Sequence, residues 1–189
     1  MTIRFPLAQP SHWQRPEVTD LPAAAESWLL AEGSLTQKLK LHSQHFSVHV
    51  IGQQTAPVFE SEFDMFRRHH KRVPFEAVVR EVILSCDDTP WVFARSIFPL
   101  SAVNQKNLNL SNIGSTSLGQ SLFDQTDLLR SPFEVSKLDI NNSIAKLNKK
   151  LHEKSHPLWG RRSLFQTSGQ QVLVSEVFLS PVPFYQELS

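Results

Sequence analysis

The sequence predicts a single α+β domain built on an antiparallel β-sheet. Several short segments alternate apolar and polar residues, which is typical of strands. Turn signals join these segments into hairpins, and the helix-start signals cluster early and in mid-chain rather than between successive strands. The 189 residues suffice for one domain, which we expect to span residues 1–189.

The N-terminal part predicts two short helices. Residues 1–19 contain three prolines and predict an irregular lead-in. Asp20 can cap a helix whose first turn holds a proline and three alanines and which ends at Gly33. Ser34 or Thr36 then begins a second short helix.

Strand periodicity follows. Residues 45–51 alternate as a strand does, and residues 52–72 are polar and mixed, with no clear element. Residues 75–85 and 91–98 predict two long strands, and residues 87–90 carry a turn signal between them. We expect a hairpin with a loop longer than the tightest kind.

The central part of the chain predicts shorter elements. Residues 100–130 are rich in Ser, Asn and Gly and predict one short helix at 118–123, capped by Ser117. A strand is expected at 133–138. Residues 140–154 predict an exposed helix with a narrow apolar stripe.

The clearest hairpin is the last one. Its strands are expected at 159–167 and 171–179, on either side of Ser168-Gly169. Short glycine-containing connections of this kind favour tight hairpin turns.

Composition limits the classes of function. Nineteen basic against 18 acidic side chains give a net charge of +1, which argues against a dedicated nucleic-acid binder. Cys86 is the only cysteine, so neither an internal disulfide nor a cysteine-based zinc site is expected, and we predict a reducing, cytoplasmic setting. We expect no signal peptide and no membrane insertion.

Charged residues interrupt three otherwise apolar strand faces. Arg80, Arg95 and Glu176 each have apolar neighbours two positions away on both sides, so each faces what would otherwise be core. One explanation is a structural ion pair, Arg80–Glu176 or Arg95–Glu176. The three together favour a ligand cavity, because pockets are mostly apolar with a few convergent polar groups. The ligand would offer a carboxylate or phosphate to an arginine, and a hydroxyl or proton to the glutamate.

Other clusters are weaker. His42, His45 and His49 could be metal ligands on a helix, but strand alternation separates His42 from the other two, and we predict no metal site. The basic run at 67–72 lacks an aromatic platform for bases and is interpreted as a solvated segment. In 159–163, an arginine is expected to pair with an acid of the neighbouring strand.

Six short motifs follow one another along the chain: Trp28-Leu29-Leu30 with Glu32, Ser34 and Thr36; Arg80-Glu81 with Ile83-Leu84 and Cys86; Pro90-Trp91 with Arg95 and Pro99; Leu118-Gly119 with Leu122-Phe123; Leu158-Trp159-Gly160-Arg161-Arg162-Ser163; and Glu176 with Phe178-Leu179, Pro183 and Tyr185. In their order and spacing, over about residues 21–185, they resemble the chorismate pyruvate-lyases, the 4-hydroxybenzoate synthases of bacterial ubiquinone biosynthesis.

The resemblance implies a fold and an activity. The fold would be a compact α+β domain whose internal ligand cavity is enclosed by helices acting as flaps. The activity would be conversion of chorismate to 4-hydroxybenzoate and pyruvate, the first committed step of ubiquinone biosynthesis, with no cofactor and no metal. The chain would bind chorismate and 4-hydroxybenzoate as a monomer, without nucleic acid.

The resemblance also implies roles for single residues. Arg80 matches the arginine that holds the aromatic carboxylate, and Glu176 matches the acid at the ring hydroxyl. Two roles are open for Glu176, namely proton removal as a base, or orientation of a substrate that transfers its hydrogen internally. Leu35 and Leu118 match positions that contact the ligand from the two flaps, and Arg95 is a candidate for the side-chain carboxylate.

Some features depart from the family pattern. Residues 138–155 are longer than the corresponding family segment and predict an insertion. Leu35 stands where the family can have methionine, and Ala94 where it can have glycine. The alternative functions are a non-enzymatic, ligand-sensing protein that binds a small aromatic acid, and a nucleic-acid protein that uses residues 67–72.

Overall fold

The sheet is the centre of the molecule. The computed structural model describes residues 3–69, 76–100, 118–123 and 125–187, and these form a seven-stranded antiparallel sheet. The strand order is β1-β2-β3-β7-β6-β4, with β5 paired to β6. The strands are β1 (Phe46–Thr55), β2 (Ala77–Cys86), β3 (Thr89–Pro99), β4 (Leu129–Arg130), β5 (Glu134–Leu138), β6 (Leu158–Thr167) and β7 (Gln170–Phe178).

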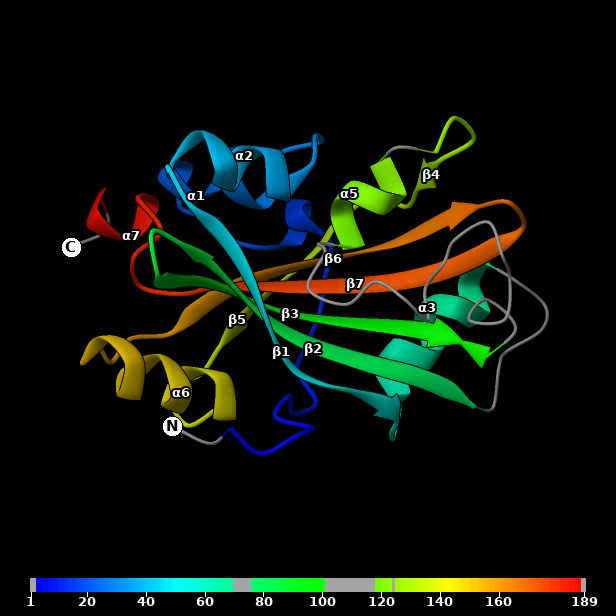
Figure 1. The fold of residues 1–189 in the computed structure, drawn as a ribbon, viewed down its shortest axis with the longest axis horizontal. Helices are drawn as coiled ribbons and strands as arrows, with labels where there is room; N and C mark the ends of the chain where they lie inside the picture. The colour runs from blue at the N-terminus through cyan, green and yellow to red at the C-terminus, as the bar shows by residue number, and fades with distance from the viewer. Residues whose placement is uncertain (1–2, 70–75, 101–117, 124, 188–189) are drawn as a thin grey trace.

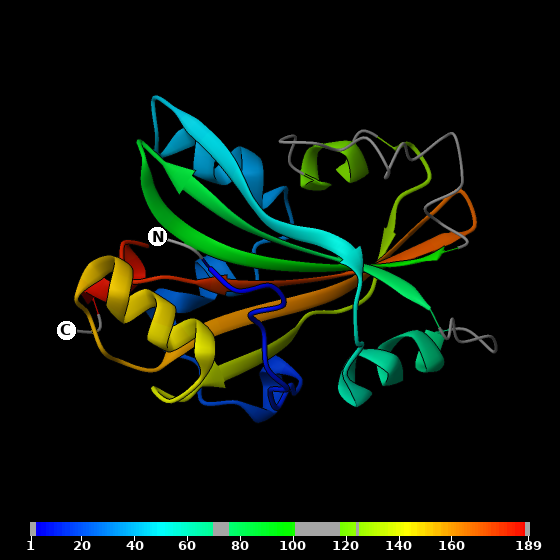
Figure 2. The ribbon, with the colours of Figure 1, turned by 60° about the horizontal axis from the view of Figure 1, so that its bottom comes forward.

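Helices cover both faces of this sheet. In Figures 1 and 2, α1, α2 and α5 lie on one face, and α3 and α6 lie on the other. The helices are η1 (Pro16–Val18), α1 (Ala23–Leu29), α2 (Leu35–Leu41), α3 (Glu60–His69), α5 (Leu118–Phe123), α6 (Ser143–His152) and α7 (Phe184–Glu187). The predicted α+β architecture is therefore confirmed.

Both long hairpins form as strand pairs, but the first loop was predicted wrongly. Asp87 and Asp88 alone connect β2 to β3, with φ angles of 48° and 60°. Aspartate tolerates this left-handed region better than most residues, so two residues suffice for the turn. The Asp87 carboxylate also accepts hydrogen bonds from the backbone N–H groups of Gln44 (3.0 Å) and His45 (2.8 Å), which ties the start of β1 to the turn.

The helix starts agree with the sequence in part. Ser34 caps α2 by accepting a hydrogen bond from Gln37 N, as expected. Asp20 does not cap α1, because the helix begins one residue after Pro22, whose side chain offers no acceptor. The stretch 52–72 contains the end of β1 and all of α3, neither of which was predicted.

Some predicted features lie on residues that the structure does not describe. The start of the expected strand at 75, the basic residues 70–72 and the proposed cap Ser117 lie outside the described part of the chain. Within that part, no helix has the length and apolar character needed to cross a membrane.

Helix α6 lies where a helix was expected but is less exposed than predicted. Asn142 caps its N-terminus by accepting a hydrogen bond from Ile144 N at 2.9 Å. The helix buries Ile144, Ala145 and Leu147 in the largest apolar cluster of the described residues. It therefore stabilises the face of the sheet that it covers.

Candidate active site

One face of the sheet, which we call the cavity face, carries the predicted site residues in two neighbouring cross-strand rows. Side chains alternate across a strand, so residues two apart share a face. Strand pairing aligns the first row as Arg80, Ser96, Val174 and Ser163, and the second as Val82, Ala94, Glu176 and Arg161. The rows run side by side across β2, β3, β7 and β6.

A pocket lies between this face and the helices above it. Arg80 and Glu176 line its floor, and Leu35 of α2 and Leu118 of α5 line it from the helices. The structure thus brings together four of the five residues predicted to contact a ligand. Ala94 also lines the pocket, beside Glu176, its Cα partner.

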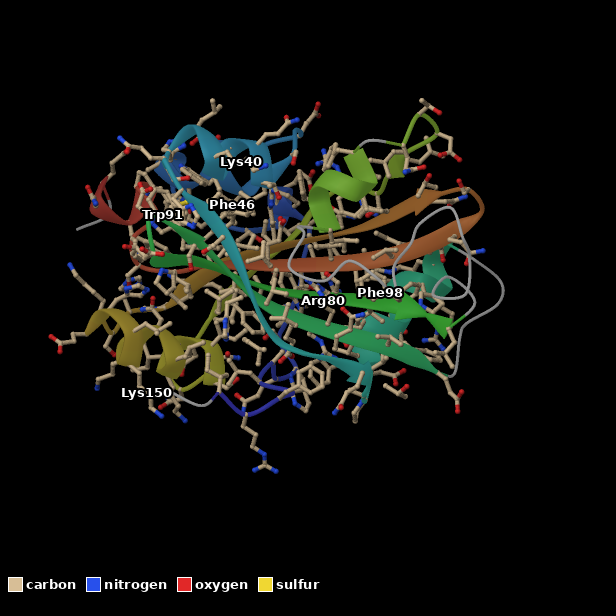
Figure 3. All side chains as sticks on the ribbon, in the orientation of Figure 1. Lys40, Phe46, Arg80, Trp91, Phe98 and Lys150 are labelled. Atoms are coloured by element: carbon tan, nitrogen blue, oxygen red, sulfur yellow. The ribbon has the colours of Figure 1, made fainter. Side chains whose placement is uncertain are left out.

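Arg80 is the buried cation of β2. It is 3% exposed, and its Nη1 donates a hydrogen bond of 2.6 Å to Gln53 Oε1 on the neighbouring strand β1. Figure 3 shows Arg80 near the middle of the sheet. Burial lowers the pKa of its guanidinium below the ordinary value, because desolvation disfavours the charged form. An anion bound beside Arg80 would offset that cost.

Glu176 is held by a second arginine. Arg161 Nε donates to Glu176 Oε2 at 2.7 Å. Arg161 Nη1 donates to the backbone oxygens of Trp28 (3.0 Å) and Ala31 (2.9 Å), at the end of α1. The predicted pairing of an arginine in 159–163 with an acid of the next strand is confirmed. The contact fixes Glu176 at the floor of the pocket.

A third arginine lies beyond Arg161. Arg130 is on the short strand β4, and its guanidinium lies 4.2 Å from the ring centroid of Phe133. Arg161 lies 4.8 Å from the same centroid, and all three residues line the pocket. Burial, and then the charge of Arg161, lower the pKa of Arg130.

The pocket also contains a hydroxyl without a partner. Ser163 is 2% exposed, and its Oγ has no hydrogen-bond partner among the described residues. Leaving such a group unsatisfied costs about 1–3 kcal/mol. Ser163 Oγ is therefore available to a polar ligand atom or a water molecule.

The charges around the pocket do not cancel. Its described lining contains three arginines and one glutamate, Arg80, Arg130, Arg161 and Glu176, for a formal charge of +2. Most of the remaining lining is apolar. This combination suits a small organic anion with more than one negative charge.

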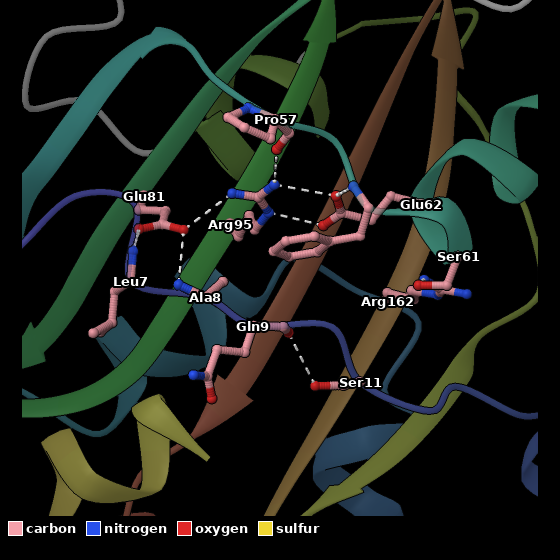
Figure 4. A network of polar contacts seen from close by, with 11 residues as sticks. Leu7, Ala8, Gln9, Ser11, Pro57, Ser61, Glu62, Glu81, Arg95 and Arg162 are labelled. Atoms are coloured by element: carbon pink, nitrogen blue, oxygen red, sulfur yellow. Dashed lines mark hydrogen bonds and ion pairs between the residues drawn. The ribbon is translucent and has the colours of Figure 1, made fainter.

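Arg95 was predicted to bind ligand, but the structure does not bring it to this pocket. It lies on the opposite face of the sheet, where Nε and Nη2 donate to Glu62 at 2.8 and 3.1 Å and Nη1 donates to Glu81 at 3.1 Å (Figure 4). Glu81 in turn accepts hydrogen bonds from Leu7 N and Ala8 N. Arg95 is thus a structural residue that joins α3, β2 and the N-terminal segment, so we do not retain it as a ligand residue.

Three pocket residues were missed as ligand candidates. Arg161 and Ser163 belong to 159–163, where only an ion pair was expected, although both alternate onto the face that Glu176 occupies. Arg130 follows an irregular stretch and lies in a two-residue strand, which is too short to show a period. The available signal was that Arg161 and Arg162 are adjacent. Neighbouring residues of a strand face opposite sides, so one of the two arginines had to share the face of Glu176.

The weaker candidates remain outside the site. His42 lies against aromatic rings, 5.1 Å from Trp28 and 6.0 Å from Trp91 between ring centroids. Within the described ranges, no cluster of three His, Cys, Asp or Glu side chains could hold a metal ion. Cys86 is buried, and this burial raises the pKa of its thiol, which disfavours the reactive thiolate.

Comparison with known sequences identifies close relatives. A family model described as chorismate lyase matches residues 7–188. A probable chorismate pyruvate-lyase of Idiomarina loihiensis is 43% identical over 185 residues, which is 97% of this chain and 93% of that protein. A protein of the same name from Shewanella loihica is 39% identical over 94% of this chain and 92% of its own length.

Solved structures share the fold at low sequence identity. The effector domain of PhnF from Mycobacterium smegmatis aligns with a TM-score of 0.55 and 11% identity, over 79% of this chain and 90% of that one. The ligand-binding domain of a putative GntR-family regulator from Bordetella bronchiseptica aligns with a TM-score of 0.52 and 15% identity, over 73% and 88% of the two chains. At such identities the likeness concerns the fold alone.

Proposed function

The chain belongs to the chorismate lyase family, and from this premise we propose that it converts chorismate to 4-hydroxybenzoate and pyruvate. The observation that carries the proposal is the pocket under α2 and α5, with its formal charge of +2 and its largely apolar lining. Chorismate is a small ring with two carboxylates, so it complements both properties.

The order of residues across the sheet supports one orientation of the ring. Only β3 separates β2 from β7, so the backbones of Arg80 and Glu176 lie about 10 Å apart across the strands. Two long side chains starting that far apart can reach opposite ends of a six-membered ring. We assign the ring carboxylate to Arg80 and the hydroxyl at the far end to Glu176.

The reaction needs alignment more than chemical assistance. The carbon that carries the hydroxyl loses its hydrogen, and that electron pair completes the aromatic ring. The neighbouring carbon loses the ether oxygen, which leaves with its electron pair as enolpyruvate. A proton taken up by enolpyruvate balances the one lost by the ring and gives pyruvate. Aromaticity drives the step, so the protein contributes positioning and exclusion of water.

Glu176 has a role that fits this step. Its carboxylate accepts a hydrogen bond from Arg161 and retains capacity to accept one from the ring hydroxyl. That second contact would fix the ring so that the breaking C–H and C–O bonds stay aligned. The proposal also includes a monomeric enzyme.

Direct assay tests the proposal. The purified protein is incubated with chorismate in excess chelator and without added cofactor, and both products are followed. We expect pyruvate and 4-hydroxybenzoate to appear in equal amounts. Binding of 4-hydroxybenzoate without turnover of chorismate would instead support the ligand-sensing alternative.

A further inference from the structure

The proposed function leaves one carboxylate of the substrate without a partner. In chorismate the enolpyruvyl ether is on the carbon next to the hydroxyl carbon. If Arg80 holds the ring carboxylate and Glu176 the hydroxyl, the side-chain carboxylate leaves the ring beside the hydroxyl, on the half of the ring that is farther from Arg80. The sheet order on that side is β7, then β6, then β4.

That end of the pocket contains Arg130 and Ser163. Arg130 pairs with Phe165 of β6, and Phe165 shares a face with Ser163 because the two are separated by two positions. Ser163 therefore lies on the strand next to Arg130, two residues from the pairing partner of Arg130. By contrast, β3 and β7 both lie between Ser163 and Arg80. Both residues line the same pocket.

The two arginines at this end differ in their remaining hydrogen-bonding capacity. Arg161 uses Nε and Nη1 in three hydrogen bonds, to Glu176 and to two backbone oxygens, and is 3% exposed. Arg130 makes a single hydrogen bond within the described part of the chain, from Nη1 to Glu32 O at 2.7 Å. A guanidinium has five N–H donors, so Arg130 retains the planar pair that a carboxylate needs.

We propose that Arg130, with the hydroxyl of Ser163, forms a second carboxylate subsite that receives the side-chain carboxylate of chorismate. The inference rests on the proposed function and deepens it. Phe133 supports the guanidinium from one side at 4.2 Å, which restricts its orientation. An incoming anion would also offset the desolvation and the repulsion by Arg161 that lower the pKa of Arg130.

The subsite distinguishes substrate from product. The carboxylate that it holds leaves as pyruvate, and 4-hydroxybenzoate keeps only the carboxylate assigned to Arg80. Loss of Arg130 should therefore weaken binding of the dianion and leave binding of the monoanionic product nearly unchanged. Loss of Arg80 should weaken both.

Two ligands test this separation at equilibrium. One is 4-hydroxybenzoate, and the other is 3-(carboxymethoxy)-4-hydroxybenzoate, a stable dianion whose ether-linked carboxylate lies next to the hydroxyl. In Arg130→Gln we expect the dissociation constant of the dianion to rise at least about tenfold, while that of 4-hydroxybenzoate changes less than about twofold. Arg130→Lys, which keeps the charge without the planar fork, should show a smaller rise.

Further variants give the controls. Ser163→Ala should raise the dissociation constant of the dianion a few-fold, which is roughly the loss of one hydrogen bond. The dissociation constant of the monoanion should not change. Arg67→Gln, on the exposed surface of α3, should alter neither. Equal weakening of both ligands in Arg130→Gln, or no weakening of either, would overturn the inference. Failure of the wild-type protein to turn over chorismate would instead remove the proposed function, and the comparison of the two ligands would still decide the role of Arg130.

Discussion

Arg80 and Glu176 interrupt apolar strands from different sides of β3, yet both face one pocket. Because the two side chains have different proposed roles in this pocket, we expect their replacement to have different effects. In the proposed site, Arg80 would donate a charge-assisted hydrogen bond to the carboxylate that substrate and product share. Glu176 offers an acceptor whose position Arg161 fixes at 2.7 Å.

Arg80→Ala should raise the dissociation constants of chorismate and 4-hydroxybenzoate by at least about tenfold, since a hydrogen bond to a charged group contributes about 1.5–3 kcal/mol. Glu176→Gln keeps the size of the side chain but loses the charge, so it should lower kcat more than it raises KM. Steady-state kinetics and calorimetry measure both. Normal turnover in both variants would contradict the assignment.

Arg95 gives the opposite expectation. Its guanidinium and the carboxylates of Glu62 and Glu81 are all buried, and removing one partner of a buried ion pair costs about 3–5 kcal/mol. Arg95→Met should lower the free energy of unfolding in urea by that amount and leave the affinity of the folded protein for 4-hydroxybenzoate unchanged. A large loss of affinity with unchanged stability would return Arg95 to the ligand site.

Helices α2 and α5, which cover the pocket, are both short. They have seven and six residues, too few for a helix that is stable alone. Leu35 and Leu118 anchor them over the pocket. Bound ligand adds contacts beneath both helices, so occupancy should stabilise them.

Hydrogen exchange can measure this stabilisation. Amides of α2 and α5 should exchange more slowly when 4-hydroxybenzoate saturates the protein, because local opening then requires loss of ligand contacts. Helix α6, on the other face of the sheet (Figure 2), supplies the internal control and should not change. Leu118→Ala should reduce the protection of the α5 amides from exchange. It should also weaken the inhibition of turnover by 4-hydroxybenzoate. Identical exchange with and without product would contradict the expected stabilisation of α2 and α5 by the ligand.

Some strands and site residues could be located from the sequence, and others could not. Period-two alternation located β2, β3, β6 and β7, and with them the faces of Arg80 and Glu176, because strand pairing preserves the face of each residue. It could not locate Arg130, since β4 has two residues and its position depends on pairing with β6. It also placed Arg95 wrongly, because its main partner Glu62 lies on α3, whose polar sequence concealed the helix.

At the scale of the whole molecule, the face opposite the pocket contains two linked ion pairs, one buried and one with a half-exposed arginine. Glu134 accepts hydrogen bonds from Arg162 (2.8 Å) and Arg68 (2.7 Å), which connects β5 to β6 and α3. Burial by itself would raise the pKa of Glu134, but the charge and hydrogen bond of Arg162, followed by those of Arg68, lower it below the ordinary value.

This lowered pKa predicts how stability depends on pH. A carboxyl whose pKa is lower in the folded than in the unfolded state stabilises the fold above the unfolded pKa, about 4.3 for glutamate. The contribution is lost as pH falls from there through the folded pKa. The free energy of unfolding should therefore fall on acidification below about pH 5. Urea titrations at several pH values should show a shallower fall in Glu134→Gln, and the wild-type slope in Glu17→Gln at an exposed position.

Arg80 and Glu81 are adjacent in the chain, but they serve opposite faces of the sheet. Arg80 belongs to the pocket, and Glu81 binds Arg95 and the backbone of Leu7 and Ala8. If β2 slipped by one residue against its neighbours, a carboxylate would enter the cationic pocket and a guanidinium would meet the N–H groups of the N-terminal segment. Both mismatches would be buried, so Arg80 and Glu81 would each destabilise the shifted strand pairing. The charges that we assign to ligand binding and to the stability of the fold would thereby also disfavour incorrect strand alignment while the protein folds.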